Sequence, residues 1–174
     1  MLEKYNRYRV LKVFLDSPTQ EFGLREISRL IRLAPPSVLN YLKEFEKDNL
    51  VRKFVSKGRP AYKAERENEN FIFYKKLSML YELHTSGLIE YLWHKLAPKT
   101  LILYGSYAKG EAIEQSDIDI FVVGKKKEIE LEKFEKIFGK EIQLMFEENF
   151  EKVSKEFKNN LMNGIVLRGY LKLF

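Results

Sequence analysis

The chain has 174 residues, of which 45% are hydrophobic and 32% are charged, so it can fill one core or two small ones. It contains no Cys, which excludes disulfide bonds and thiolate-bound zinc. No stretch approaches the roughly 18 continuous apolar residues of a membrane span, and the first residues lack the apolar core of a signal peptide. We therefore expect a soluble, cytoplasmic protein with no membrane partner.

Charge is unevenly distributed along the chain. Residues 1–66 hold 15 Lys and Arg against 8 Asp and Glu, a net charge of +7, whereas residues 67–174 hold 16 against 17, a net charge of −1. A basic segment beside a neutral one is typical of a polyanion-binding domain joined to something else. The alternative that charge leaves open is a solvated Lys-rich surface.

The basic segment predicts helices followed by a hairpin. The helices are expected at residues 5–16, at 24–31 and from Pro35 onward, and the β-type runs at 50–55 and 61–64. Proline suits the first turn of a helix, because its φ is fixed there and its missing N–H is not needed. A short turn joins the second and third helices, as in a helix-turn-helix, whose second helix enters a DNA major groove.

The hairpin carries Lys57-Gly58-Arg59 at its turn, and residues 48–62 resemble the helix-to-wing passage of winged-helix transcription regulators. The resemblance covers residues 5–66 and implies double-stranded DNA as a partner. It also implies that Lys57 and Arg59 contact phosphates, which adds affinity without reading sequence. The alternative is a winged helix that serves in dimerisation or protein docking.

Base-reading candidates lie on the third helix, away from its apolar face. They are Ser37, Asn40 and Tyr41. Glu44 shares that outer side and argues mildly against close approach to phosphates.

Residues 71–97 are expected to form a long helix, which follows the polar, aperiodic stretch 66–70. Apolar residues recur at steps of three and four from Phe73 to Leu96 and keep one stripe on one face. Gly87 interrupts the stripe, as at a bend. Such a stripe fits the interface of a homodimer.

Residues 98–174 change to short strands and helices, so the expected fold class of the chain is α+β. Strands are predicted at 100–104, 118–123, 141–146 and 164–169, and helices at 129–138 and 150–161.

The first chemical motif is Gly105-Ser106, which follows the buried strand 100–104. Glycine lets the backbone approach a ligand closely. Free N–H groups at the start of a helix suit phosphate oxygens, and the Ser106 hydroxyl adds a donor. The pair therefore predicts a phosphate-binding turn.

The second motif is Asp117-Ile118-Asp119 at the start of the next strand. Period-two geometry places both carboxylates on one face, where they repel one another unless a cation lies between them. Magnesium that carries substrate phosphates meets this need. An exposed edge strand is the alternative explanation for two acids at this spacing.

Together the two motifs resemble the signature of DNA polymerase β-like nucleotidyltransferases, and residues 97–170 look like the minimal members found in archaea and bacteria. The resemblance implies transfer of a nucleoside monophosphate from a triphosphate, usually ATP, with Mg²⁺ or Mn²⁺. It implies that Gly105 and Ser106 hold phosphates, and that Asp117 and Asp119 are catalytic metal ligands.

The chain departs from this family where a third carboxylate is expected. The aligned position holds Gln143, whose amide oxygen can coordinate a metal but supplies no charge. Glu141, two residues earlier on the same face, is the candidate to substitute as a catalytic group. Lys109 is a candidate phosphate ligand, with a solvated side chain as the alternative.

The expected organisation is a winged helix-turn-helix at 1–66, a connecting helix at 67–97 and a minimal nucleotidyltransferase domain at 98–174. Three functions remain open: a nucleotidyltransferase directed to DNA, a transcription regulator whose degenerate transferase domain senses nucleotide, and an antitoxin-like adenylyltransferase with a protein acceptor. A scaffold that only mediates oligomerisation would leave the paired aspartates unexplained.

Overall fold

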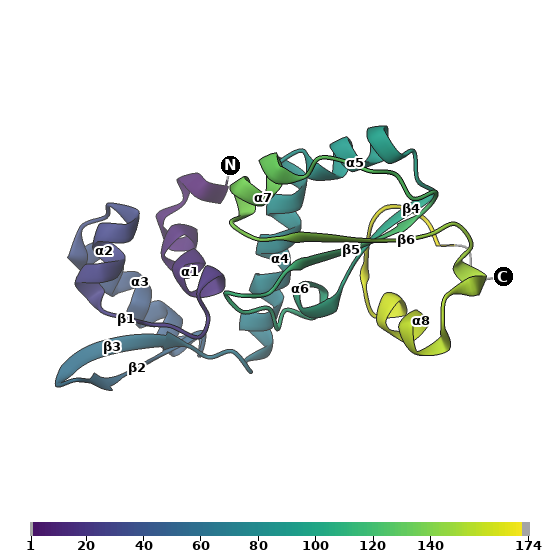
Figure 1. The fold of residues 1–174 in the computed structure, drawn as a ribbon. Coiled ribbons are helices and arrows are strands. Elements are labelled where there is room, and N and C mark those ends of the chain that lie inside the picture. The colour runs from purple at the N-terminus through teal and green to yellow at the C-terminus, as the bar shows by residue number, and fades with distance from the viewer. Residues whose placement is uncertain (1, 172–174) are drawn as a thin grey trace. The chain divides into compact units, whose positions relative to one another are not determined.

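The computed structural model describes residues 2–171 and divides the chain into two compact units, Met1–Ser78 and Met79–Phe174. Each unit has its own sheet and its own hydrophobic core (Figure 1). The predicted mixture of helices and strands is confirmed. Across the described residues, no helix combines the length and apolar character needed to cross a membrane.

The first unit alternates helices with the strands of a three-stranded antiparallel sheet, ordered β1-β3-β2. Its elements are η1 Leu2–Lys4, α1 Asn6–Asp16, β1 Glu21–Phe22, α2 Leu24–Ile31, α3 Pro35–Lys47, β2 Val51–Ser56, β3 Arg59–Ala64 and the first part of α4 Glu69–Thr85. The three helices and the hairpin expected in this segment are present. The two-residue strand β1 was not predicted, because it is too short to show a period.

Local interactions set the ends of the helices in this unit. The Glu26 carboxylate accepts a hydrogen bond of 3.2 Å from the Gly23 N–H and so caps the start of α2. Arg32 ends α2 in the left-handed conformation, with φ 51°. Pro35 then opens α3, as its fixed φ favours.

The core of the first unit lies where α1, α2 and α3 meet the sheet. Its fully buried members include Val10, Phe14, Ile27, Leu42 and Phe45. The start of α4 also belongs to this unit. There the buried Lys75 ammonium donates to the Leu15 carbonyl at 2.5 Å, which provides the buried charge with a partner.

The single helix predicted over residues 71–97 is wrong: the structure has two helices, α4 and α5 Leu88–Leu96. Gly87 separates them with φ 80°, a left-handed conformation that ends a helix and that glycine adopts at little cost. The predicted stripe is not the buried face of α4, since Phe73 and Leu77 are exposed whereas Phe71, Met79 and Leu83 are buried.

The second unit is built on a four-stranded mixed sheet with the order β6-β5-β4-β7. After α5 its elements are β4 Thr100–Tyr104, α6 Gly105–Lys109, β5 Ile118–Val123, α7 Glu132–Phe138, β6 Ile142–Glu147, η2 Phe150–Lys152, α8 Lys155–Met162 and β7 Ile165–Gly169. Strands β5 and β6 are parallel and α7 connects them, whereas β4 is antiparallel to both β5 and β7.

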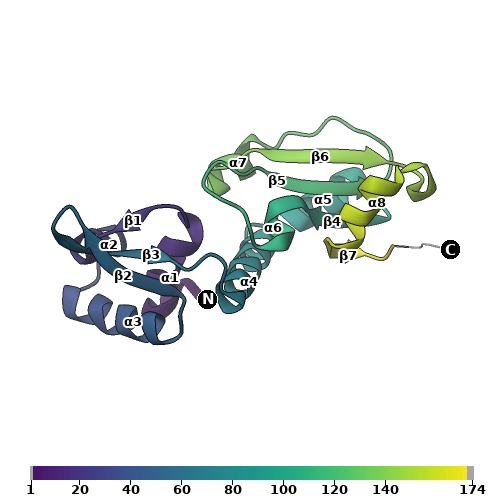
Figure 2. The same cartoon turned by 90° about the horizontal axis from the view of Figure 1, so that it is seen from below.

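Helices cover both faces of this sheet. Figures 1 and 2 show α5 and α7 on one side and α8 on the other. Leu101, Leu103 and Ile120 pack in the core under α5 and α7, whereas Ile102 and Phe121 pack in a smaller core with residues of α8. Because side chains alternate along a strand, Asp119 shares the α8 side of the sheet with Phe121.

Candidate functional site

Three residues on neighbouring strands form a row at one end of the sheet. Asp119 of β5 is the register partner of Tyr104 on β4 and of Gln143 on β6. Register partners present their side chains on the same face, about 5 Å apart. The sheet therefore places the phenol, the carboxylate and the amide beside one another.

Gly105 follows Tyr104 and begins the short helix α6, with φ 71°. A Cβ atom at this position would lie 2.4 Å from Oδ2 of Asp119 and 3.2 Å from its Cγ. The Asp119 carboxylate thus packs directly against the backbone of the Gly105-Ser106 turn. Glycine is required here both for the positive φ and for the close approach.

Asp117 stands one residue before β5 and is held by the loop that follows α6. The Ile113 N–H donates to the Ser116 hydroxyl at 2.9 Å, and the Ser116 N–H donates back to the Ile113 carbonyl at 3.1 Å. Lys140 donates to the Glu114 carbonyl of the same loop. These bonds fix the approach of Asp117 to the sheet.

The electrostatics of the row are unfavourable to negative charge. Burial, followed by the charge of Asp117, raises the pKa of the Asp119 carboxyl above its ordinary value. Burial, followed by the charge of Asp119, likewise raises the pKa of the Tyr104 phenol. Two adjacent carboxylates that repel in this way offer oxygen ligands to a divalent cation, so the residues present fit Mg²⁺ or Mn²⁺.

The comparison with protein families agrees with this geometry. Residues 86–167 match the nucleotidyltransferase domain family. The match runs from just before α5 into β7 and includes the Gly105-Ser106 turn, both aspartates and Gln143. No curated protein and no solved structure matches the chain.

Tyr104 is the member of the row that the sequence analysis missed. Its ring meets the Phe157 ring of α8 edge-on, with centroids 5.2 Å apart. The sequence shows Tyr104 only as the last residue of an apolar strand. Its place beside Asp119 depends on the β4–β5 register, and no local pattern reports that register.

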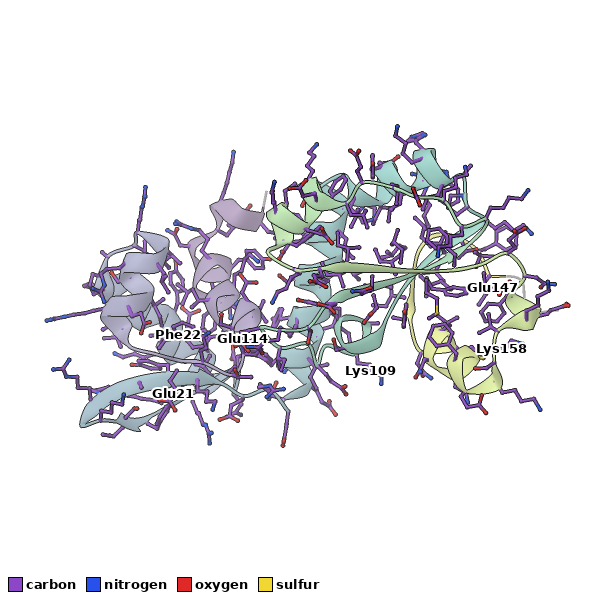
Figure 3. The ribbon with its side chains drawn as sticks, in the orientation of Figure 1. Glu21, Phe22, Lys109, Glu114, Glu147 and Lys158 are labelled. Atoms are coloured by element: carbon purple, nitrogen blue, oxygen red, sulfur yellow. The ribbon has the colours of Figure 1, made fainter. Side chains whose placement is uncertain are left out.

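Gln143 of the row and the two remaining candidates, Glu141 and Lys109, all have exposed side chains. Gln143 is exposed, and its Nε2 donates to Oε2 of the exposed Glu141 at 3.4 Å. Lys109 is exposed at the last residue of α6 and projects from that helix (Figure 3). Within residues 2–171, no three His, Asp or Glu side chains gather as a metal-binding cluster.

The DNA-contact candidates all lie in the first unit. On α3, Asn40 is exposed and Ser37 is half-buried, whereas Tyr41 packs against the hydrophobic core. Lys57 and Arg59 are exposed at the turn between β2 and β3.

Replacing Gly105 by Ala should destabilise the protein and displace the Asp119 carboxylate. The left-handed φ costs an alanine about 1–2 kcal/mol, and the new methyl group would overlap Oδ2 of Asp119. Gly139→Ala is the matched control, since Gly139 has φ 63° and open space around it. We expect only Gly105→Ala to abolish the rise in Tm produced by Mg²⁺ and ATP, and equal behaviour of the two variants would contradict this.

Replacing Asp119 by Asn should stabilise the metal-free protein near neutral pH. A raised pKa means that the folded state binds the Asp119 proton more tightly than the unfolded chain does, so its contribution to stability falls as pH rises above about 4. The variant lacks this loss, and its Tm should exceed that of the wild type by roughly 1–3 °C at pH 7, but not at pH 3. Thermal unfolding across this pH range measures the difference. The exposed Glu148→Gln serves as control and should leave Tm unchanged.

Proposed function

We propose that the second unit transfers a nucleoside monophosphate from ATP to an acceptor hydroxyl and releases pyrophosphate. The observation that carries the proposal is the contact between the Asp119 carboxylate and the Gly105 backbone, because it brings a phosphate-binding turn and a cation-binding pair together. The family match to residues 86–167 supports nucleotidyl transfer in general.

The phosphate-binding turn, the two aspartates and Lys109 each have a role in this reaction. Gly105 and Ser106 would hold the β- and γ-phosphates through backbone N–H groups and the Ser106 hydroxyl. Asp117 and Asp119 would hold Mg²⁺ or Mn²⁺, which when bound neutralises charge on the phosphates. Lys109 lies at the end of α6, the helix that begins at Gly105, and would bind the γ-phosphate.

The chemistry is an in-line displacement at the α-phosphorus. The acceptor oxygen forms a bond to this phosphorus, the bond to the bridging oxygen of the β-phosphate breaks, and pyrophosphate leaves. Glu141 is the group proposed to take the proton of the acceptor hydroxyl, since it lies on the same strand face as Gln143.

We further propose that the first unit is a winged helix that binds double-stranded DNA. Some of its acids are ion-paired within the unit: Arg7 pairs with Glu44 at 3.0 Å and with Asp48 at 3.2 Å, and Arg52 pairs with Glu65 at 3.3 Å. Glu44, which argued against phosphate approach, is therefore engaged by α1.

Several other cations of the first unit are available to an anionic partner. Among the described residues, the side chains of several exposed cations form no ion pair or hydrogen bond. They are Arg25, Arg29 and Arg32 of the α2 region, Lys43 and Lys47 of α3, and Lys57 and Arg59 of the hairpin. On α3, Asn40, Lys43 and Lys47 recur at steps of three and four on one exposed face. Unpaired cations on one small unit favour a polyanion as partner.

A second candidate function is a regulator that senses nucleotide without turnover. The amide of Gln143 beside Asp119 favours it, because an amide neither carries charge nor accepts a proton from a hydroxyl. In this case nucleotide binding would alter DNA affinity.

Nucleotidyl transfer is tested with ATP labelled at the α-phosphate, Mg²⁺ and cell lysate as the source of acceptors. We expect label transfer by the wild type and at least a 100-fold loss in Asp117→Ala combined with Asp119→Ala, since the cation ligands are removed. The Glu148→Gln variant should transfer label as the wild type does. Absence of transfer from the wild type, with ATP binding intact, would favour the sensor instead.

DNA binding is tested by fluorescence anisotropy with a labelled duplex at several salt concentrations. Replacing Lys57 and Arg59 together by Ala should weaken binding roughly tenfold, and the slope of log affinity against log salt should fall by about 2, because two phosphate contacts are lost. Lys136→Ala is the control, since Lys136 lies in the other unit and pairs with Glu132 at 2.6 Å. Equal affinities of the two variants would rule out the hairpin contacts.

A further inference from the structure

We infer that this site holds one divalent cation with its nucleotide rather than two, and that Gln143 sets this number. The inference rests on the proposed function, because it concerns how the same site holds a nucleoside triphosphate. Its basis is the position of a neutral side chain in the row of Tyr104, Asp119 and Gln143.

Gln143 occupies the place beside Asp119 on the outer strand of the sheet. Its Cα is the register partner of Asp119 on the parallel strand β6, and neighbouring strands lie about 4.8 Å apart. Both side chains are on the α8 side of the sheet. A third ligand contributed by β6 to a cation on Asp119 would therefore come from residue 143.

Charge decides how many cations such a place can hold. Two divalent cations that share one site lie about 3.5–4 Å apart, and their repulsion must be offset by anionic ligands. Asp117 and Asp119 supply two negative charges. Together with the β- and γ-phosphates, these carboxylates bind the first cation. An amide oxygen at position 143 adds a dipole but no charge, so β6 supplies no anionic ligand to a second cation beside Asp119.

Glu141 does not restore the missing charge in the observed arrangement. It lies two residues before Gln143, about 6–7 Å away along the strand. The Gln143 amide group donates to Oε2 of Glu141 at 3.4 Å, so the carboxylate is engaged along β6 rather than across the sheet toward Asp119. The amide thus occupies the third-ligand position, and in the metal-free fold it contacts the nearest acid, which lies one residue before β6.

The test counts cations directly with Mn²⁺ as the probe. Free Mn²⁺ is measured by electron paramagnetic resonance while the full chain is titrated in the presence of a saturating ATP analogue with a methylene group between the α- and β-phosphates. We expect one Mn²⁺ per bound analogue in the wild type and two in Gln143→Glu, which exchanges an amide for a carboxylate of the same shape. The matched control is Met145→Glu, because Met145 is 46% exposed on the same face of β6 but lies opposite Phe121. It should bind one Mn²⁺.

Two Mn²⁺ per analogue in the wild type would overturn the inference, and a fall to one in Glu141→Gln would then identify Glu141 as the third ligand. One Mn²⁺ in Gln143→Glu would also overturn it. Failure of the proposed function has a different signature: the analogue would not bind the wild type, or it would bind Asp119→Asn with the same affinity and Mn²⁺ dependence. That result would overturn the inference as well.

Discussion

The pairing of β4 with β5 is the constraint on which the candidate site depends. Because Tyr104 is opposite Asp119, the residue that follows Tyr104 must pass next to the Asp119 carboxylate. Only glycine leaves room for this passage, since a Cβ atom would fall within 2.4 Å of Oδ2. A shift of one residue in this register would turn Asp119 to the opposite face of the sheet and separate it from the turn.

The same pairing places the Asp119 carboxylate in a part of the sheet that disfavours its negative charge. Ile118, Ile120, Phe121 and Val122 of β5 are all at most 1% exposed, so Asp119 stands in a strand that otherwise consists of core residues. The rest of the second unit offsets this cost, because its four strands and the helices on both faces bury ample apolar area. A site that violates the apolar pattern of its own strand is expected where function, not stability, selects the residue.

The sequence allowed prediction of the elements that local patterns define. Strands 100–104 and 118–123 match β4 and β5, because continuous apolar runs bounded by polar residues are characteristic of buried strands. The two motifs in those strands pointed to Asp119 and Gly105. Gly87 marked the position of the break between α4 and α5, but the sequence did not show whether the glycine bends one helix or separates two.

Long-range order was harder to predict than local structure. The strand order β6-β5-β4-β7 brings together segments that are far apart in the sequence, and no pattern within one strand records it. Tyr104 became part of the site only through that order. Gln143 was identified because the resemblance supplied an expected position, and its register with Asp119 then gave that position a physical meaning.

Lys75 and Asp119 differ in how the protein accommodates their charges, and this contrast favours a ligand at Asp119. Lys75 is 6% exposed, and the Leu15 carbonyl accepts from its ammonium, so the fold itself meets the need of that charge. Burial, followed by the charge of Asp117, raises the pKa of the Asp119 carboxyl, so no partner among the described residues offsets the cost of its ionisation. A charged side chain with a structural role needs a partner within the protein. A carboxylate that is repelled by its neighbour is instead stabilised when a cation binds. The free energy that the ionised Asp119 costs the metal-free protein is therefore recovered when a cation and its nucleotide bind there.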